Sequence, residues 1–223
     1  MGKILVSGLT NIETTVKVEG FPIEYNPINY NFFGVNSTVS GVAINMGKAL
    51  NECDIAALCN INFSRPYLKK AREMGKLVAT DVHVISAVND EYNTDFMKYA
   101  NILFMSDENI GDNVEDFVRE VISKCDNDII VVGLGAKGAL LYVKEDNFME
   151  RFNAVTTRKV VNTIGAGDSL FSAFLHYYNK ERNPYLALKK AIVFASYKIG
   201  ESGAAEGFLT EEELDKLYEK TNN

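Results

Sequence analysis

Apolar residues in this chain fall in two kinds of segment: short continuous runs, and longer stretches with helical spacing. The short runs predict buried strands at 3–8, 55–61, 76–82, 101–106 and 128–135. The helical spacing predicts helices at 42–50, 64–75, 95–99 and 114–125, then two long helices and a last one at 210–220. Strands that alternate with helices predict an α/β fold, with a mostly parallel sheet covered by helices on both faces.

Capping residues place the ends of several predicted helices. Ser64 is expected to be the N-cap of the helix at 64–75, and Gly75 to end it. We expect Asp112 to cap the helix at 114–125 and Thr210 to cap the last one. Two stretches, 14–20 and 29–34, have a more polar alternation and interrupt the pattern, which predicts a separate small sheet.

Composition narrows the possible functions. The 223 residues, 47% of them hydrophobic, predict a single domain over 1–223. A net charge of −7 without a basic cluster argues against nucleic-acid binding, and the chain has no apolar run as long as a membrane span. The start of the chain has no signal-peptide pattern, so we expect a cytoplasmic protein with reduced thiols at Cys53, Cys59 and Cys125. Two histidines are too few for a His-rich zinc site.

Gly133, Gly135 and Gly138 have the G-x-G-x-x-G spacing of a dinucleotide-binding turn. That motif requires a helix after its last glycine, whereas Gly138 is followed by the β-rich A-L-L-Y-V-K. The stretch therefore predicts strand, glycine turn and strand, and no bound NAD. The glycines let the backbone pass close to a ligand or to another strand, or they simply make a tight hairpin.

Small residues precede one of the long helices. Gly165, Ala166 and Gly167 stand before a stripe of Leu170, Phe171, Phe174, Leu175 and Tyr178 that recurs at helical spacing. The amides of such a helix start attract an anion, and small residues let it approach. Asp168 beside them fits phosphoryl transfer, as the group that accepts a proton from an attacking hydroxyl. Alternatively, Asp168 only complements the helix dipole.

The stretch N-T-I-G-A-G-D at 162–168 resembles the D-T-x-G-A-G-D signature of the ribokinase-like (PfkB) carbohydrate kinases. Further resemblances follow in family order: G-L-T-N-I-E at 8–13, S-G-V-A-I-N at 40–45, G-L-G-A-K-G at 133–138 and G-A-A-E-G-F at 203–208. The resemblance implies the ribokinase-like fold. It also implies ATP and Mg2+ as cofactors, with Asp168 as catalytic base and Gly165, Ala166 and Gly167 as anion hole.

The other motifs carry binding roles by the same resemblance. Asn11, Glu13, Gly41 and Asn45 would contact the sugar. Gly133, Gly135, Lys137, Gly138, Gly203 and Ala204 would contact the nucleotide.

The chain departs from the family pattern at Asn162, Glu13 and Ser40. The family's N-x-x-E element, which is tied to magnesium, reads S-D-E-N at 106–109, so Asp107 and Glu108 are the nearest substitutes. The chain is also several dozen residues shorter than usual members, and the shortfall is predicted near 60–62, where one strand leads almost directly into a helix.

The function expected is ATP-dependent phosphoryl transfer to a hydroxyl of a sugar or sugar-like alcohol. A nucleoside kinase and a non-catalytic sugar- or nucleotide-binding relative remain alternatives. Residues 11–38 are expected to form a β lid, because phosphoryl transfer needs a site without water. The exposed edges of such a lid favour a homodimer.

Overall fold

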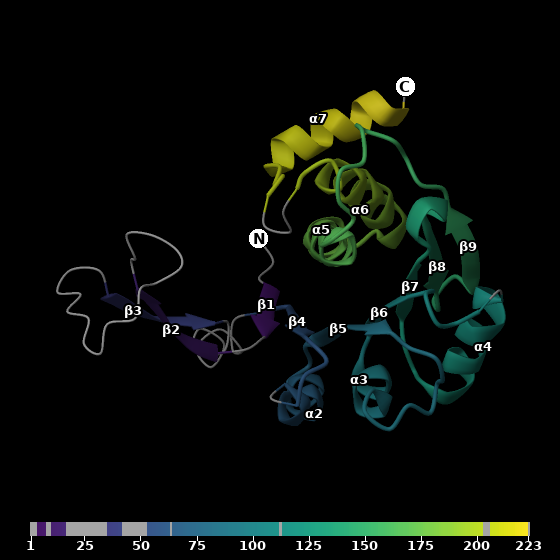
Figure 1. Cartoon of the computed structure of the whole chain (residues 1–223). Coiled ribbons are helices and arrows are strands. Elements are labelled where there is room, and N and C mark those ends of the chain that lie inside the picture. The colour runs from purple at the N-terminus through teal and green to yellow at the C-terminus, as the bar shows by residue number, and fades with distance from the viewer. Residues whose placement is uncertain are drawn as a thin grey trace.

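The structure is a computed structural model that describes residues 4–7, 10–16, 35–41, 53–62, 64–111, 113–202 and 206–222, the first three segments by their backbone alone. A seven-stranded sheet in the order β1-β4-β5-β6-β7-β8-β9 forms its centre, and β2 and β3 make a separate two-stranded sheet (Figure 1). The strands of the large sheet are β1 (Ile4–Ser7), β4 (Ile55–Leu58), β5 (Leu77–Val84), β6 (Ile102–Ser106), β7 (Ile129–Gly133), β8 (Ala139–Val143) and β9 (Phe148–Phe152). Strands β1 to β7 of this sheet pair in parallel, and β8 and β9 are antiparallel.

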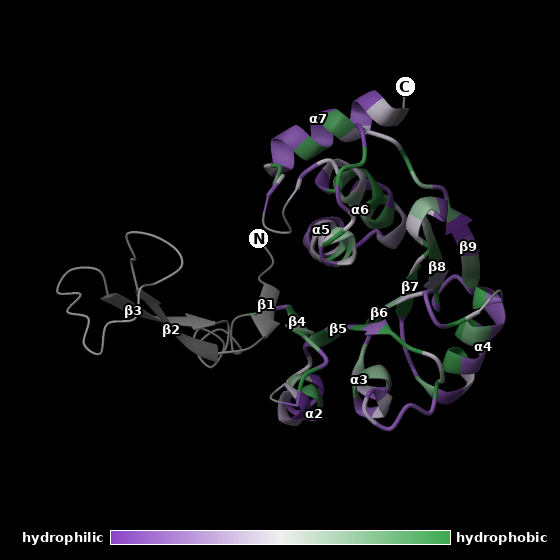
Figure 2. Cartoon of the chain, viewed as in Figure 1, coloured by the Kyte–Doolittle hydropathy of each residue, from purple (hydrophilic) through white to green (hydrophobic). Residues whose placement is uncertain are grey.

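Helices cover both faces of the large sheet, as the alternation of strands and helices predicts. Helices α2 (Arg65–Glu73), α3 (Thr94–Tyr99) and α4 (Val114–Lys124) share one hydrophobic core with one face of the sheet. Helices α5 (Ala166–Glu181), α6 (Pro184–Lys198) and α7 (Glu211–Asn222) share the other (Figure 1). The predicted α/β class is confirmed. Figure 2 shows the hydrophobic colour concentrated on strands such as β7 and β8 inside the molecule, whereas much of α7 is hydrophilic.

The caps agree with the sequence in part. Gly75 ends the α2 region with a φ of 70°, and Ser64 is the N-cap residue of α2, although its side chain makes no capping hydrogen bond. The prediction for α4 was wrong, because its N-cap is Asn113, whose Oδ1 accepts the Asp116 N–H. Either short polar side chain suits that place, and only the backbone path decides which one reaches the amide. Asp112 lies outside the described residues.

The two-stranded sheet pairs β2 (Thr10–Val16) with β3 (Val35–Gly41) in antiparallel register. A separate small sheet is therefore present, with a strand later in the chain than predicted. The stretch at 29–34 and the helix predicted at 42–50 lie outside the described residues. That the small β2–β3 sheet acts as a lid stays a prediction. No helix in the described ranges combines the length and apolar character needed to cross a membrane.

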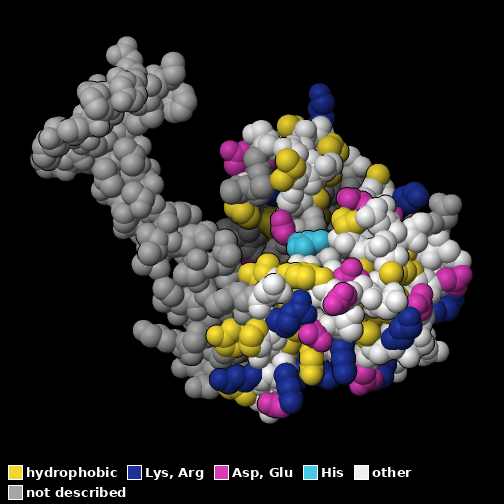
Figure 3. Space-filling view, turned by 60° about the horizontal axis from the view of Figure 1, so that its bottom comes forward, with side chains coloured by type: hydrophobic (Ala, Val, Ile, Leu, Met, Phe, Trp, Pro, Cys, Tyr) yellow, Lys and Arg dark blue, Asp and Glu magenta, His cyan; other side chains and the backbone are white. Residues whose placement is uncertain are grey.

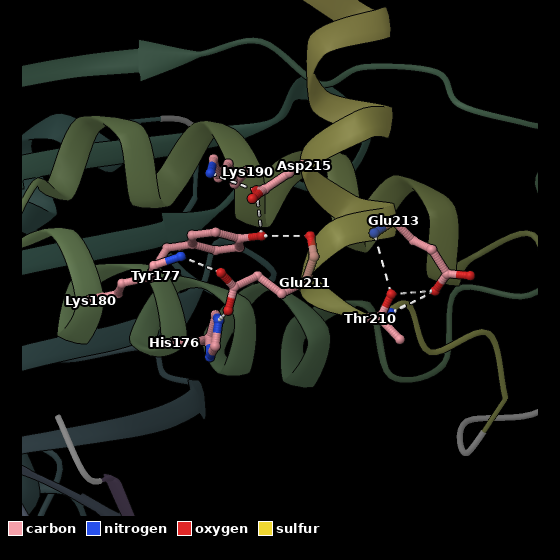
Figure 4. Close-up of polar contacts among 8 residues, drawn as sticks. All are labelled: His176, Tyr177, Lys180, Lys190, Thr210, Glu211, Glu213 and Asp215. Carbon is pink, nitrogen blue, oxygen red and sulfur yellow. Dashed lines mark hydrogen bonds and ion pairs between the residues drawn. The ribbon is translucent and has the colours of Figure 1, made fainter. Parts of the chain in front are cut away.

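Helix α7 is held on α5 and α6 by polar contacts (Figure 4). Glu211 accepts from Lys180 and lies 2.9 Å from Nε2 of His176. Asp215 accepts from the hydroxyl of the buried Tyr177 at 2.7 Å and from Lys190 Nζ at 2.6 Å. Burial, and then the Asp215 carboxylate, raise the pKa of the Tyr177 phenol.

The N-terminus of α7 has the predicted cap. Thr210 Oγ1 accepts the Glu213 N–H at 3.3 Å, and the Glu213 carboxylate accepts the Thr210 N–H at 2.8 Å. This reciprocal pair is a capping box.

We predict that Glu211→Gln destabilises the protein in a pH-dependent way. Lys180, and then His176, hold the pKa of the Glu211 carboxyl below its ordinary value of 4.5. A lowered folded-state pKa stabilises the fold above the ordinary pKa, and that stabilisation is lost as the pH falls through the folded-state value. We expect Tm to fall by roughly 2 °C at pH 7, since exposed pairs contribute about 0.2–1 kcal/mol each.

Thermal melts of the two proteins from pH 7 to pH 3 measure this difference, which should vanish at the acid end. Glu212→Gln is the matched control, because Glu212 lies in the same first turn of α7 but, among the described residues, forms its ion pair with Lys216 of its own helix. Equal effects of the two substitutions at pH 7 would contradict a role of Glu211 in docking α7.

Candidate active site

The first turn of α5 lies open to an approaching anion. Gly165 is the N-cap with a φ of 81°, a left-handed conformation that glycine adopts without steric cost. A Cβ added at Gly167 would meet no atom within 4 Å, so space lies beside this turn. Within the described part of the chain, the amides of Gly167 and Asp168 make no recorded backbone hydrogen bond, and the side chain of Asp168 is exposed. Of the predicted anion hole, Ala166 already donates its N–H to the Thr163 carbonyl at 3.1 Å, so anion binding by Gly165, Ala166 and Gly167 stays a prediction.

The loop before α5 is tied to the end of α6. The amides of Val161 and Asn162 both donate to the Ile199 carbonyl, at 2.8 and 3.0 Å. Asn162 accepts the Ile164 N–H at 3.0 Å and donates to the Ser202 carbonyl at 2.7 Å. An aspartate here could accept the first bond but could not donate the second, so asparagine suits this loop.

Burial inside α5 follows the predicted stripe. Leu170, Phe174 and Leu175 are buried, and Phe171 and Tyr178 are half-buried. The helical periodicity therefore located the buried face of α5. The first turn of the helix, by contrast, is exposed at Gly167 and Asp168. Tyr177, which is 1% exposed, was missed because its hydroxyl needs a partner from α7, far along the chain.

The glycine turn after β7 contains a short 3-10 helix, Gly135–Lys137, and then β8. This confirms strand, turn and strand in place of a dinucleotide-binding helix. Gly138 has a φ of 96°, and a Cβ there would lie 1.9 Å from the Phe152 carbonyl oxygen. The sequence left open whether these glycines allow close approach to a ligand or to another strand. Gly138 lies close to the backbone at the end of β9, whereas Gly135 has open space beside it.

A pocket of about 300 Å³ joins the loops that follow β6 and β7. Its walls include Asp107 and Glu108 from the first loop and Leu134 and Lys137 from the second. The two loops are bonded directly, because the Asp107 N–H donates to the Gly133 carbonyl at 3.1 Å. The structure thus brings the S-D-E-N element beside the predicted nucleotide loop. A larger hollow of about 760 Å³ lies elsewhere, lined by Asp128 at the amino end of β7 and by Arg182.

The remaining predicted residues are placed only in part. Asn11 and Glu13 lie on β2 and Gly41 on β3, where Asn11 pairs with Ser40 and Thr10 with Gly41, so the three share one small sheet. Asn45, Gly203 and Ala204 lie outside the described residues. Their proposed contacts with sugar and nucleotide stay predictions.

Two residues whose electrostatics involve Asp168 were not predicted from the sequence as site residues. Burial raises the pKa of the Asp81 carboxyl, and the negative charge of Asp168 raises it further. Burial also raises the pKa of the Cys59 thiol, and the charges of Asp81 and Asp168 add to that. These groups stand at the carboxyl ends of β5 and β4. The signal in the sequence was the polar pair Asp81 and His83 at the end of an otherwise apolar strand.

A mostly parallel sheet covered by helices on both faces defines an α/β protein of the doubly wound class, in which ligands commonly bind at the carboxyl ends of the strands. The chain belongs to the pfkB family of carbohydrate kinases, since the family model described as "pfkB family carbohydrate kinase" matches residues 62–211.

Individual relatives support this assignment. The chain is 29% identical over 187 residues to a ribokinase of Dictyostelium discoideum, a match that covers 73% of this chain and 58% of the relative. The chain thus aligns to little more than half the length of that relative.

Solved structures share the fold. A microbiome-derived acarbose kinase superposes with a TM-score of 0.73 at 22% identity, over 96% of this chain and 70% of that one. The ribokinase of Arabidopsis thaliana, solved with ribose and ATP, superposes with a TM-score of 0.64 at 18% identity, over 82% of this chain and 65% of that one.

We predict that Gly167→Val weakens ATP binding far more than it weakens the fold. The added Cβ meets no atom within 4 Å, so the folded state tolerates it, but a branched side chain blocks a phosphate from the open amides. Calorimetric titration with ATP and thermal melts measure the two effects. Gly167→Ala is the graded control and should weaken ATP binding less. A collapse in Tm with unchanged ATP affinity would show that the glycine is structural.

Proposed function

We propose that this protein transfers the γ-phosphoryl group of ATP to a hydroxyl of a sugar or a sugar-like alcohol. The observation that carries the proposal is the open first turn of α5, where Asp168 stands beside amides free to receive an anion. Relatives named ribokinase and acarbose kinase support a carbohydrate acceptor. The ATP in the Arabidopsis ribokinase structure supports the nucleotide.

In the proposed reaction, Asp168 accepts the proton of the attacking hydroxyl, and the amides at Gly167 and Asp168 stabilise the negative charge of the transferred group. The loops that line the 300 Å³ pocket would hold the nucleotide, with Lys137 on its wall. Asn11, Glu13, Gly41 and Asn45 would bind the sugar, and Gly203 and Ala204 would complete the nucleotide site. The small β2–β3 sheet would exclude water from the site as a lid, and dimerisation would cover its edges.

The residues present fit a magnesium ion. The described ranges hold no group of three or more His, Cys, Asp or Glu side chains placed to bind a metal. Magnesium on a nucleotide commonly uses one or two carboxylates together with phosphates and water. Asp107 and Glu108 line the pocket of the proposed nucleotide loop and would supply those carboxylates. When bound, magnesium neutralises charge on the phosphates.

A screen of ATP consumption tests this function directly. The full chain is incubated with ATP and MgCl₂ against a panel of pentoses, hexoses, polyols and nucleosides, and ADP formation is followed. We expect ADP to form only when a carbohydrate acceptor is present. Acceptance of nucleosides alone would assign the nucleoside alternative, and ATP binding without ADP formation on any acceptor would assign a non-catalytic relative.

A further inference from the structure

Strand β5 ends irregularly at the carboxyl edge of the sheet. Its register with β6 shifts between Asp81 and Val84, and His83, inside the shift, has a φ of 57°. A left-handed backbone is uncommon for a residue with a side chain and persists only where the surroundings hold it.

The carboxylate of Asp81 holds this conformation. Its Oδ1 accepts the His83 N–H at 2.8 Å, and its Oδ2 lies 3.6 Å from Nδ1 of the His83 ring. The Asp81 side chain is 14% exposed, whereas that of His83 is 58% exposed. The half-buried carboxylate of Asp81 therefore lies next to an imidazole that is exposed to solvent. Figure 3 shows a face of the molecule on which a histidine side chain lies at the surface beside acidic ones.

Strand geometry places Asp81 on the side of the sheet that carries α5. Ala79, two residues earlier, belongs to the core shared with α5 and α6, and side chains two apart on a strand share a face. Asp81 pairs with Phe104 of β6, whose ring contacts the Phe171 ring at 5.0 Å between centroids. Phe171 lies three residues after Asp168, about one helical turn.

Electrostatics agree with this placement. His83 lowers the pKa of Asp81 while Asp168 raises it, so Asp81 interacts with both. A phosphoryl group that approaches the first turn of α5 therefore meets negative charge from Asp168 and from Asp81. A positive group is needed nearby to balance it.

We propose that His83 contacts the anionic phosphoryl group at the N-terminus of α5, and that Asp81 is a positioning residue that holds His83 there. The Nδ1 atom of the ring faces Asp81 at 3.6 Å, which leaves Nε2, when it carries a hydrogen, to donate to a phosphate oxygen. The inference rests on the proposed function, because it adds a second phosphate contact to the same site.

Nuclear magnetic resonance of the full chain detects this contact through the chemical shifts of the histidine ring nitrogens, and it requires no catalytic turnover. The sequence contains two histidines, so the ring nitrogens of His83 and His176 are readily assigned with His83→Gln and His176→Gln. ATP with MgCl₂ is the first probe and inorganic phosphate the second. We expect the His83 signals to shift with both, while those of His176, which contacts Glu211 of α7, stay in place. Unchanged His83 signals with both probes overturn the inference. Absence of ATP binding contradicts the proposed function alone.

Variants separate a phosphate contact from a structural role. His83→Gly relieves the left-handed backbone, so Tm should stay or rise, while kcat falls about tenfold to a hundredfold and KM for ATP stays within about twofold. Added imidazole should partly restore kcat. Asp81→Asn still accepts the His83 N–H but loses its charge, and should lower kcat several-fold.

Asn147→Gly is the matched control, because Asn147 is also left-handed, with a φ of 48°, in the turn between β8 and β9. It should relieve the same strain and leave kcat unchanged. A wild-type kcat in His83→Gly, or a loss that imidazole does not restore and that follows a fall in Tm, overturns the inference.

Discussion

Asp168→Asn is expected to lower kcat by about a hundredfold to ten-thousandfold while the affinity for ATP changes by less than about twofold. The carboxylate acts on the hydroxyl proton in the transition state, and the amides that receive phosphate remain in place. Initial rates with the best acceptor of the screen, together with calorimetric titration of ATP, measure both quantities.

A matched control distinguishes catalysis from a helix-dipole effect. Asp116 is the third residue of α4, after the N-cap Asn113, as Asp168 is the third residue of α5, after the N-cap Gly165. If Asp168 only complements the dipole, Asp168→Asn and Asp116→Asn should both cost about 0.3–1 kcal/mol of stability and leave kcat near wild type. That outcome would refute the assignment of Asp168 as the base.

Gly138→Ala is expected to be the most damaging small substitution for the fold. The new Cβ would lie 1.9 Å from the Phe152 carbonyl oxygen and 2.6 Å from the Ala154 nitrogen, both backbone atoms that no rotamer change can move. The φ of 96° adds strain for any residue with a Cβ. We expect a loss of more than about 3 kcal/mol and a fall in Tm of roughly 10 °C.

Gly135→Ala in the same turn is the control for this effect. Gly135 is also left-handed, with a φ of 56°, but a Cβ there meets no atom within 4 Å. It should therefore cost only the backbone strain of about 1–2 kcal/mol. Denaturant titration of the three proteins measures the difference, and equal losses would show that conformation, not the contact with β9, dominates at Gly138.

Several elements could be predicted because their signal is local. Burial of one or both faces of an element is encoded in the residues of that element alone. It appears as apolar runs in β5, β6 and β7 and as helical spacing in α2, α4 and α5. The glycine spacing at 133–138 could be rejected as a dinucleotide site for the same reason, since the β-rich residues that follow it are local evidence against a helix.

Contacts between distant segments could not be predicted. The choice of Asn113 over Asp112 as the α4 cap depends on the path of the loop, and the need for glycine at 138 depends on the end of β9. The pairing of Tyr177 with Asp215 joins two helices whose relative placement no local pattern encodes.

The sequence by itself determined the α/β class and the start of α5, where it also predicts an anion site at Gly165, Gly167 and Asp168. Hydrophobic periodicity acts over a few residues, so the sequence of one segment is enough to recognise it. Only the tertiary structure decided which groups meet that site. Cys59 directly follows β4, Asp81 lies in β5 and Asp168 lies in α5, and parallel pairing brings the carboxyl ends of the strands to one edge. Because strand order and register set that meeting, the carboxylate of Asp81 and the strained backbone of His83 become visible only in the folded chain.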